Sequence, residues 1–117
     1  MKFLRALMLG VSLLLVSPVL AHSPHGDPEL DKFYESLKIP GTELSCCNLE
    51  DCKPVKIRTF EGKLQAFIDK SFPGGDEKWY DVPTNKVLTP RENPVGEPVA
   101  CWNSYIKIIC FVNGSGT

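Results

Sequence analysis

The segment Cys46-Cys47-Asn48-Leu49-Glu50-Asp51-Cys52 holds three of the five cysteines of the chain within seven residues. Thiolate clusters of this density can bind zinc or copper(I), but structural zinc sites use paired C-x2–4-C spacings, and adjacent cysteines point in opposite directions in an extended chain. Catalytic thiol–disulfide exchangers carry a C-x-x-C pair, which this chain lacks. Structural disulfides therefore rank above a metal site and above redox catalysis for Cys46, Cys47, Cys52, Cys101 and Cys110.

Geometry narrows how these cysteines can pair. A Cys46–Cys47 bridge is not expected, because adjacent Cα atoms lie about 3.8 Å apart and ordinary disulfides need about 4.4–6.8 Å. In a tight C-terminal hairpin Cys101 would face roughly Ile106, which leaves Cys110 on the order of 13 Å farther along the strand. Cys101 and Cys110 are therefore not expected to form a disulfide with each other. The remaining arrangement links the cluster to the C-terminal hairpin by two bridges. One cluster cysteine then takes part in neither bridge, and it could link two chains into a disulfide-bonded dimer.

The first 21 residues have the pattern of a secretory signal peptide. Lys2 and Arg5 precede an apolar run from Leu7 to Val16, and Val19-Leu20-Ala21 offers small or aliphatic residues at the cleavage positions. Cleavage after Ala21 is predicted, which would give a periplasmic or secreted protein with all its cysteines in an oxidising compartment. The apolar stretch is shorter than the roughly 20 residues of a spanning helix, which argues against an uncleaved anchor. No later stretch is long enough to span a bilayer, so no stable membrane insertion is expected after cleavage.

The mature chain has the size of one small domain. Removal of residues 1–21 takes away Lys2 and Arg5 and no acidic residue, leaving 11 basic and 14 acidic side chains that are interspersed along the chain. Without a basic run, nucleic acid is not an expected partner. We expect a mobile leader at 22–26, one disulfide-bearing domain at 27–112 and a flexible tail at 113–117.

A helix is predicted from Asp27 onward. Asp27 is suited to the N-cap and Pro28 to the first helical position, and Ile39-Pro40-Gly41 should stop the helix. Apolar residues at the i, i+3, i+4, i+7 positions indicate one packing face, made of Leu30, Phe33, Tyr34 and Leu37.

The rest of the domain has the pattern of short strands and turns. Residues 54–60 and 64–70 should form a hairpin around the loop Glu61-Gly62-Lys63. Further strands are expected at 79–82, 86–89, 99–102 and 106–112, with loops at 71–78 and 91–98 and a turn near Asn103-Ser104. The last strand is apolar on both faces, so it should be central in the sheet or lie beneath the helix. The predicted fold class is α+β: one N-terminal amphipathic helix, then a small disulfide-stabilised antiparallel sheet of about five strands.

Histidine usage gives no support for a catalytic site. The mature chain has only His22 and His25, both ahead of the first helix, so no cysteine or serine of the folded body has a histidine base. Cleavage after Ala21 would make His22 the N-terminal residue, whose amine and imidazole together can chelate copper, with His25 as a further ligand. Solvated histidines without a metal are the simpler interpretation.

Other residues with chemical potential have a simpler structural interpretation. Glu50-Asp51 and Asp76-Glu77 are expected to be solvated loop charges, because sequence neighbours usually diverge. Gly74-Gly75 and Gly114-x-Gly116 do not lead into a helix and are not phosphate loops. Aromatic residues that can line a ligand surface, but are more often core, are Trp79, Tyr80, Trp102 and Tyr105.

Five segments together resemble a group of small exported alphaproteobacterial proteins that share a Cys-Cys-x4-Cys motif. These segments are Ser45-Cys46-Cys47-Asn48-x-x-Asp51-Cys52-Lys53-Pro54-Val55, Lys78-Trp79-Tyr80-Asp81-Val82-Pro83, Asn93-Pro94-x-Gly96, Cys101 and Ile109-Cys110-Phe111-Val112. The resemblance covers most of residues 33–112. It implies that five cysteines are the pattern of the group, and it supplies no activity, substrate or catalytic residue.

Two classes of function remain open from the sequence. The first is a non-enzymatic periplasmic or secreted module, without a cofactor, that binds an envelope or extracellular protein. The second is a copper-binding protein that uses the mature N-terminal histidine or the cysteine cluster. An enzyme is not expected, because the mature body has no histidine, no C-x-x-C pair and no nucleotide loop.

Overall fold

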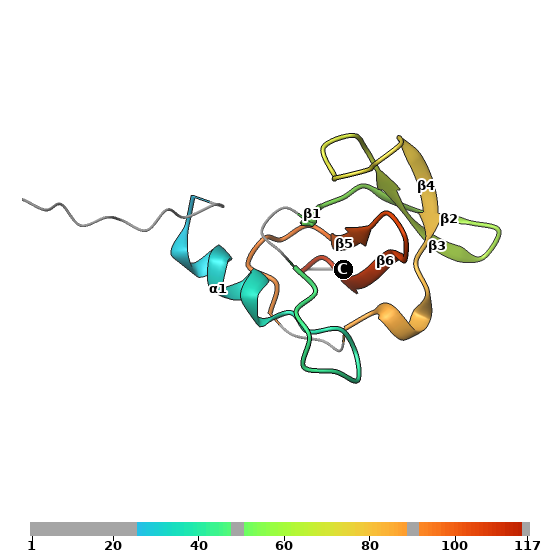
Figure 1. Ribbon diagram of the computed structural model, residues 1–117. Helices are drawn as coiled ribbons and strands as arrows, with labels where there is room; N and C mark the ends of the chain where they lie inside the picture. Colours follow the sequence, from blue (N-terminus) through green and yellow to red (C-terminus); the bar gives the residue numbers. More distant parts are fainter. Residues whose placement is uncertain (1–25, 48–50, 89–91, 116–117) are drawn as a thin grey trace, which may run out of the picture.

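The computed structural model describes residues 26–47, 51–88 and 92–115. Within these residues the fold is a small α+β fold with one α-helix and two antiparallel three-stranded sheets (Figure 1), where the sequence predicted about five strands in a single sheet. One sheet has the strand order β1-β5-β6 and the other β2-β3-β4. The elements are α1 (Pro28–Ser36), β1 (Cys52–Pro54), β2 (Ile57–Phe60), β3 (Lys63–Ile68), β4 (Lys78–Asp81), the 3-10 helix η1 (Thr84–Lys86), β5 (Val99–Asn103) and β6 (Lys107–Val112).

Helix α1 begins as predicted. Asp27 is the N-cap, and its carboxylate accepts a hydrogen bond of 2.9 Å from the backbone N–H of Glu29. The helix ends at Ser36, before the predicted stop at 39–41, because the backbone of Leu37 is already extended. Its predicted apolar face is confirmed: Phe33, Tyr34 and Leu37 are buried, and Leu30 packs against the same cluster.

The predicted strand 54–60 is divided between the two sheets. Its start belongs to β1, which pairs with β5, and its end is β2, which pairs with β3. The chain crosses over at Val55, whose N–H donates to the carbonyl of Pro98, and at Lys56, whose carbonyl accepts from Phe67. A continuous extended run in the sequence does not show to which neighbour each half is bonded.

A two-residue turn joins β2 to β3. The predicted loop Glu61-Gly62-Lys63 is wrong by one residue, because Lys63 already pairs with Phe60. Glu61 and Gly62 both have positive φ, 52° and 79°, which is the backbone of a type I′ hairpin turn.

The β5–β6 hairpin corrects the expected register. Its turn lies at residues 104–106, and the register shifts by one residue between Cys101 and Trp102. As a result Cys110 lies directly opposite Cys101 and is not displaced along the strand. Ile106, which was predicted to be in the strand, lies in the turn and is exposed. A bulge adds a residue to one side of a hairpin, and the alternation of side chains alone does not predict it.

Strand β6 is buried on both faces, as predicted, although the central strand of its sheet is β5. One face of β6 packs into the cluster that contains the α1 side chains, and the other into the cluster beneath the second sheet. The predicted strand 86–89 is replaced over its described part by the end of η1 and a single parallel bridge from Val87 to Phe111. Thr89 lies outside the described residues. No helix within the described ranges is long and apolar enough to cross a membrane.

Candidate functional site

Both disulfides join the cysteine cluster to the β5–β6 hairpin, which is the arrangement expected from the sequence. Cys46 is bonded to Cys110 with Cα atoms 6.0 Å apart, and Cys52 to Cys101 with Cα atoms 3.9 Å apart. Cys47 is half-buried and belongs to neither disulfide. The expected absence of a Cys101–Cys110 bridge holds, but its physical reason was wrong: the two residues face each other across the strands, and each is bonded to a different partner.

Tyr34 lies next to this cysteine cluster in the core beneath α1. Its side chain is 4% exposed and packs edge-on against Phe33, with ring centroids 5.4 Å apart. Burial, together with negative charge at Cys47 and Glu97, raises the pKa of Tyr34 to about 12. A phenol that stays neutral in this way is a packing and hydrogen-bonding group at ordinary pH.

Of the candidate metal ligands, the structure describes the cysteines and not the histidines. His22 and His25 lie outside these residues, so a copper site at the mature N-terminus is not tested by the structure. Among the residues that are described, no group of three or more histidine, cysteine or acidic side chains is placed to hold a metal ion.

The two side chains of the acidic pair Asp76-Glu77 have different surroundings. Asp76 accepts hydrogen bonds of 2.7 and 2.9 Å from the phenol of Tyr80, and these bonds are the main reason that the pKa of Tyr80 is raised. Asp76 also pairs with Lys78 at 3.8 Å. Glu77 is exposed, and its backbone has a φ of 63°. The other pair is only partly described, because Glu50 lies outside the described residues. Asp76 therefore fixes a loop.

The four aromatic residues noted in the sequence lie in three different settings. Trp102 is buried and donates its indole N–H to the carbonyl of Pro73 at 3.0 Å. Tyr80 packs on Trp102 with ring centroids 4.8 Å apart, on the inner side of the second sheet. Tyr105 is 92% exposed at the tip of the β5–β6 hairpin. Trp79 lies on the opposite face of the β2-β3-β4 sheet from Tyr80.

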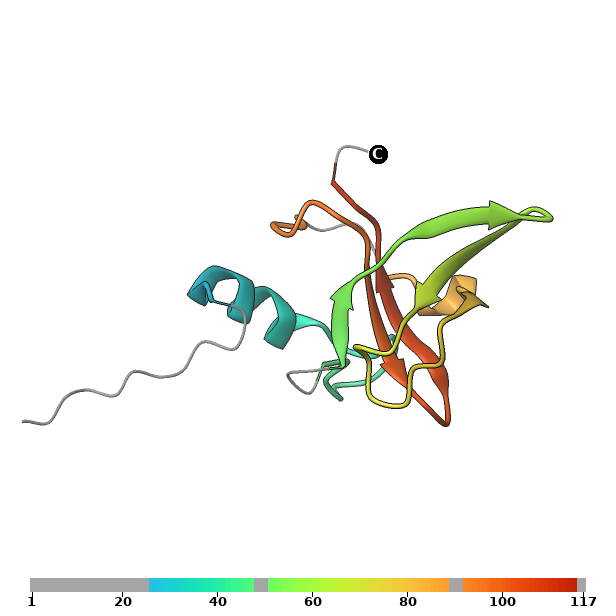
Figure 2. The same cartoon turned by 90° about the horizontal axis from the view of Figure 1, so that it is seen from above.

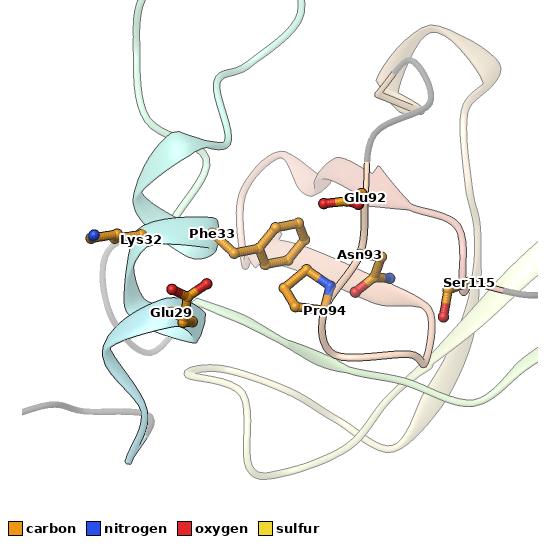
Figure 3. A pocket seen from close by; sticks show the side chains of 7 residues that line it. All are labelled: Glu29, Lys32, Phe33, Glu92, Asn93, Pro94 and Ser115. Atoms are coloured by element: carbon orange, nitrogen blue, oxygen red, sulfur yellow. The ribbon is translucent and has the colours of Figure 1, made fainter.

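A cleft of about 630 Å³ lies between α1 and the loop that precedes β5. Figure 3 shows Phe33 and Pro94 facing each other across it, whereas the side chain of Lys32 points to the far side of the helix. Glu29 and Glu92 are exposed at its margins. Its described lining residues include one serine, Ser115, and neither histidine nor cysteine.

Asn93 at the back of this cleft has a structural role. Its side chain is 7% exposed and donates two hydrogen bonds of 2.9 Å, to the carbonyls of Glu97 and Asn113. Its amide oxygen accepts bonds from the N–H groups of Val95 and Gly96. All four hydrogen-bonding positions of the amide are used, and they attach the loop to the end of β6.

The outer face of the β2-β3-β4 sheet carries a cation held between aromatic rings. Cζ of Arg58 lies 4.6 Å from the ring centroid of Phe60 and 4.4 Å from that of Trp79. Phe67 extends the aromatic surface, with its ring edge-on to Trp79 at a centroid distance of 5.2 Å. The register of the strands places alternate residues on this face, namely Arg58, Phe60, Lys63, Gln65, Phe67, Trp79 and Asp81; we call these seven residues the outer face.

Polar contacts fix the orientation of the Arg58 guanidinium. Nε of Arg58 donates to the side-chain oxygen of Gln65 at 2.7 Å, and Gln65 in turn donates to Asp81 at 2.8 Å. Lys63 pairs with the same carboxylate at 3.7 Å. Within the described part of the chain, no hydrogen bond or ion pair reaches the two Nη groups of Arg58. Their planar array of donors suits a carboxylate or another flat anionic group.

Of the seven outer-face residues, the sequence pointed only to Trp79. Arg58 and Phe60 lie in a predicted strand, but their side of the sheet depends on the hairpin register. The three-residue loop first expected would have paired Phe60 with Leu64 and turned Arg58 toward the buried face of Ala66. Type I′ turns prefer glycine at their second central position, and Gly62 is therefore the residue in the sequence that favours the two-residue turn.

The chain matches no model of a known protein family, no curated protein and no solved structure with which it was compared.

Proposed function

We propose that this chain is an exported, non-enzymatic binding module that uses the outer face to contact an envelope or extracellular protein. The observation that carries the proposal is the Arg58 guanidinium, held between Phe60 and Trp79 with its Nη donors directed at no other described group. Exposed aromatic and arginine side chains are the residue types that dominate binding energy in protein interfaces. Holding them in place beforehand lowers the entropy lost on binding.

Export is supported by two independent features. Residues 1–21 have the charge and hydropathy pattern of a signal peptide. Two disulfides are expected in an oxidising compartment and are rare in the cytosol. Intact-mass analysis of the protein recovered from the periplasm or medium should give a chain that begins at His22. Full-length chain retained in the membrane fraction would contradict the export part of the proposal.

Site-specific photo-cross-linking in the native cell tests the binding part. The photoreactive residue p-benzoylphenylalanine replaces Phe60 on the outer face or, as a matched control, Tyr105, an exposed aromatic residue at the tip of the other hairpin. We expect a discrete cross-linked partner from position 60 and none from position 105. Adding Arg58→Ala to the position-60 chain should reduce the adduct. Adducts from position 105 alone, or no adduct from position 60, would refute the outer face as the binding surface.

A further inference from the structure

Strand β2 leaves backbone hydrogen-bonding groups unused at the edge of its sheet. The strand order β2-β3-β4 gives it a neighbour on one side only. The N–H of Phe67 bonds to the carbonyl of Lys56, and groups alternate along an antiparallel strand, so the N–H and C=O of Ile57 and Thr59 point away from β3. These four groups are placed as a template for one further strand.

The surroundings of β2 leave this edge accessible. All four of its residues are exposed, and the β2–β3 hairpin projects from the body of the molecule (Figure 2). The edge of β6, by contrast, is covered by the segment after η1, where the N–H of Leu88 donates to the carbonyl of Phe111 at 2.8 Å.

Charge decides which kind of strand fits. The hairpin from Lys56 to Lys63 carries three cations, Lys56, Arg58 and Lys63, against one anion, Glu61. Lys63 is already paired with Asp81 of β4, so Lys56 and Arg58 are the cations that a further strand would meet. A second copy of the chain is disfavoured, because the antiparallel register that uses all four edge groups would place Arg58 directly opposite the Arg58 of that copy. The edge also offers apolar area, since Ile57 is 41% and Phe60 46% exposed.

We infer that an extended acidic segment of a partner protein adds to the edge of β2 as a fourth strand. Its carboxylates would alternate along the strand on the Arg58 side, and its apolar side chains would lie on the Ile57 side. This inference rests on the proposed binding function and deepens it by naming the chemistry of the partner. Backbone bonds would give affinity and the alternating carboxylates would give selectivity.

Selection of peptides tests the inference on the mature, oxidised protein. A phage-displayed library of random linear peptides is selected for binding to the wild-type chain. The bound peptides are then measured against Thr59→Pro, which removes an outward N–H that β3 does not use, and against the matched control Thr59→Ala. We expect enrichment in aspartate and glutamate, an affinity loss of about tenfold for Thr59→Pro and little loss for Thr59→Ala. On adding peptide, hydrogen exchange at the amides of Ile57 and Thr59 in the wild-type chain should slow, which checks the contact without any variant.

The outcomes separate this inference from the proposed function. Failure to select any peptide, selection of basic or uncharged peptides, or equal binding to Thr59→Pro would overturn strand addition. A soluble polyanion such as polygalacturonate that displaces the peptides and binds Thr59→Pro equally would show that the outer face recognises charge alone. Cross-linking at position 60 would then still support a binding module. Peptides that pass every test while position 60 gives no cross-link would instead place binding at the edge and refute the outer face.

Discussion

Tyr34 shows how one side chain combines packing with a measurable electrostatic property. It occupies the buried face of α1 and lies close enough to Cys47 and Glu97 for their negative charge to oppose its ionisation. Asn93 shows the complementary case, a buried polar group that is tolerated because all its hydrogen bonds are satisfied. The environment of Tyr34 cannot be seen in the sequence, because it depends on contacts with Cys47 and Glu97. For Asn93 the same holds only of its bond to Asn113, since its other three partners lie within four residues.

Alkaline titration should reveal the raised pKa of Tyr34. The unfolded chain loses this proton near pH 10 and the folded chain near pH 12, so the folded state binds more protons between these values. The resulting stability is fully present below pH 10 and is lost as the pH rises toward 12, at on the order of 1 kcal/mol per pH unit. Rapid pH-jump urea unfolding should show this loss in the wild-type chain and a smaller one in Tyr34→Phe. Equal slopes in the two proteins would contradict the assignment.

Removing the Asn93 amide should destabilise the fold by about 2 kcal/mol, because Asn93→Ala removes part-buried bonds to the carbonyls of Glu97 and Asn113 and to the N–H of Val95, whereas the N–H of Gly96 keeps its bond to the backbone carbonyl of residue 93. Asn93→Asp is the second variant: it keeps the acceptor for Val95 and Gly96, but it loses the two donated bonds and places a carboxylate oxygen against the carbonyls of Glu97 and Asn113. Urea denaturation should rank the wild-type chain above both variants. An Asn93→Ala midpoint equal to that of the wild type would show that water replaces these bonds.

At the scale of elements, the short turn between β2 and β3 determines which side chains reach the outer face. A turn of two residues pairs Arg58 with Gln65 and places its side chain on the face of the sheet that points away from the core. One more residue in the turn would move the β2 side chains to the opposite faces. The helix was predictable because its cap, its apolar spacing and its buried face agree. The strands were predictable as extended segments, but their partners, the crossover at Val55 and the bulge after Cys101 depend on long-range pairing that local patterns do not show.

The turn itself can be tested by two substitutions that should change the stability of the hairpin in opposite directions. Gly62→Ala should destabilise the hairpin by about 1 kcal/mol, because φ is 79° there while no atom lies within 4 Å of an added Cβ, so the effect is conformational. Glu61→Asn should stabilise it by about 0.5 kcal/mol, since asparagine accepts the positive φ of 52° more readily. Hydrogen exchange at the amide of Phe67, which bonds across this hairpin to Lys56, reports both changes. A change of the same sign in both variants would be inconsistent with a type I′ turn.

For the whole molecule, the two disulfides are nested: the Cys46–Cys110 ring encloses the Cys52–Cys101 ring. Pairing between the cluster and the hairpin followed from the spacing of the cysteines, even though the register used to exclude a Cys101–Cys110 bridge was wrong. The sequence did not predict which of the three cluster cysteines takes part in neither disulfide, because this depends on the direction in which each cysteine side chain points. In a chain of 117 residues the core is small enough for these crosslinks to supply a large share of the stability.

Because the rings are nested, their contributions should not add simply. With one disulfide intact, the other closes a loop of about 15 residues through it, so replacing either pair by alanines should cost about 3 kcal/mol. Replacing both pairs should cost about 7 kcal/mol, which is comparable to the whole stability of a small domain. Urea denaturation of the two double variants and the quadruple variant measures this, with Cys47→Ala, which keeps both rings, as the control. A folded quadruple variant would show that the core suffices without crosslinks.

The Cys46–Cys110 bond also has a mechanical consequence. It joins a residue ahead of β1 to a residue near the end of β6, so a force that pulls the ends of the chain apart is carried through this covalent bond and bypasses every strand pair except the last two of β6, Phe111 with Ala100 and Val112 with Val99. Tension can detach α1, which precedes the bond, but it cannot unravel the strands that the ring encloses. A protein tethered between the cell envelope and a moving partner would therefore keep its outer face intact under load for as long as this bond stays oxidised.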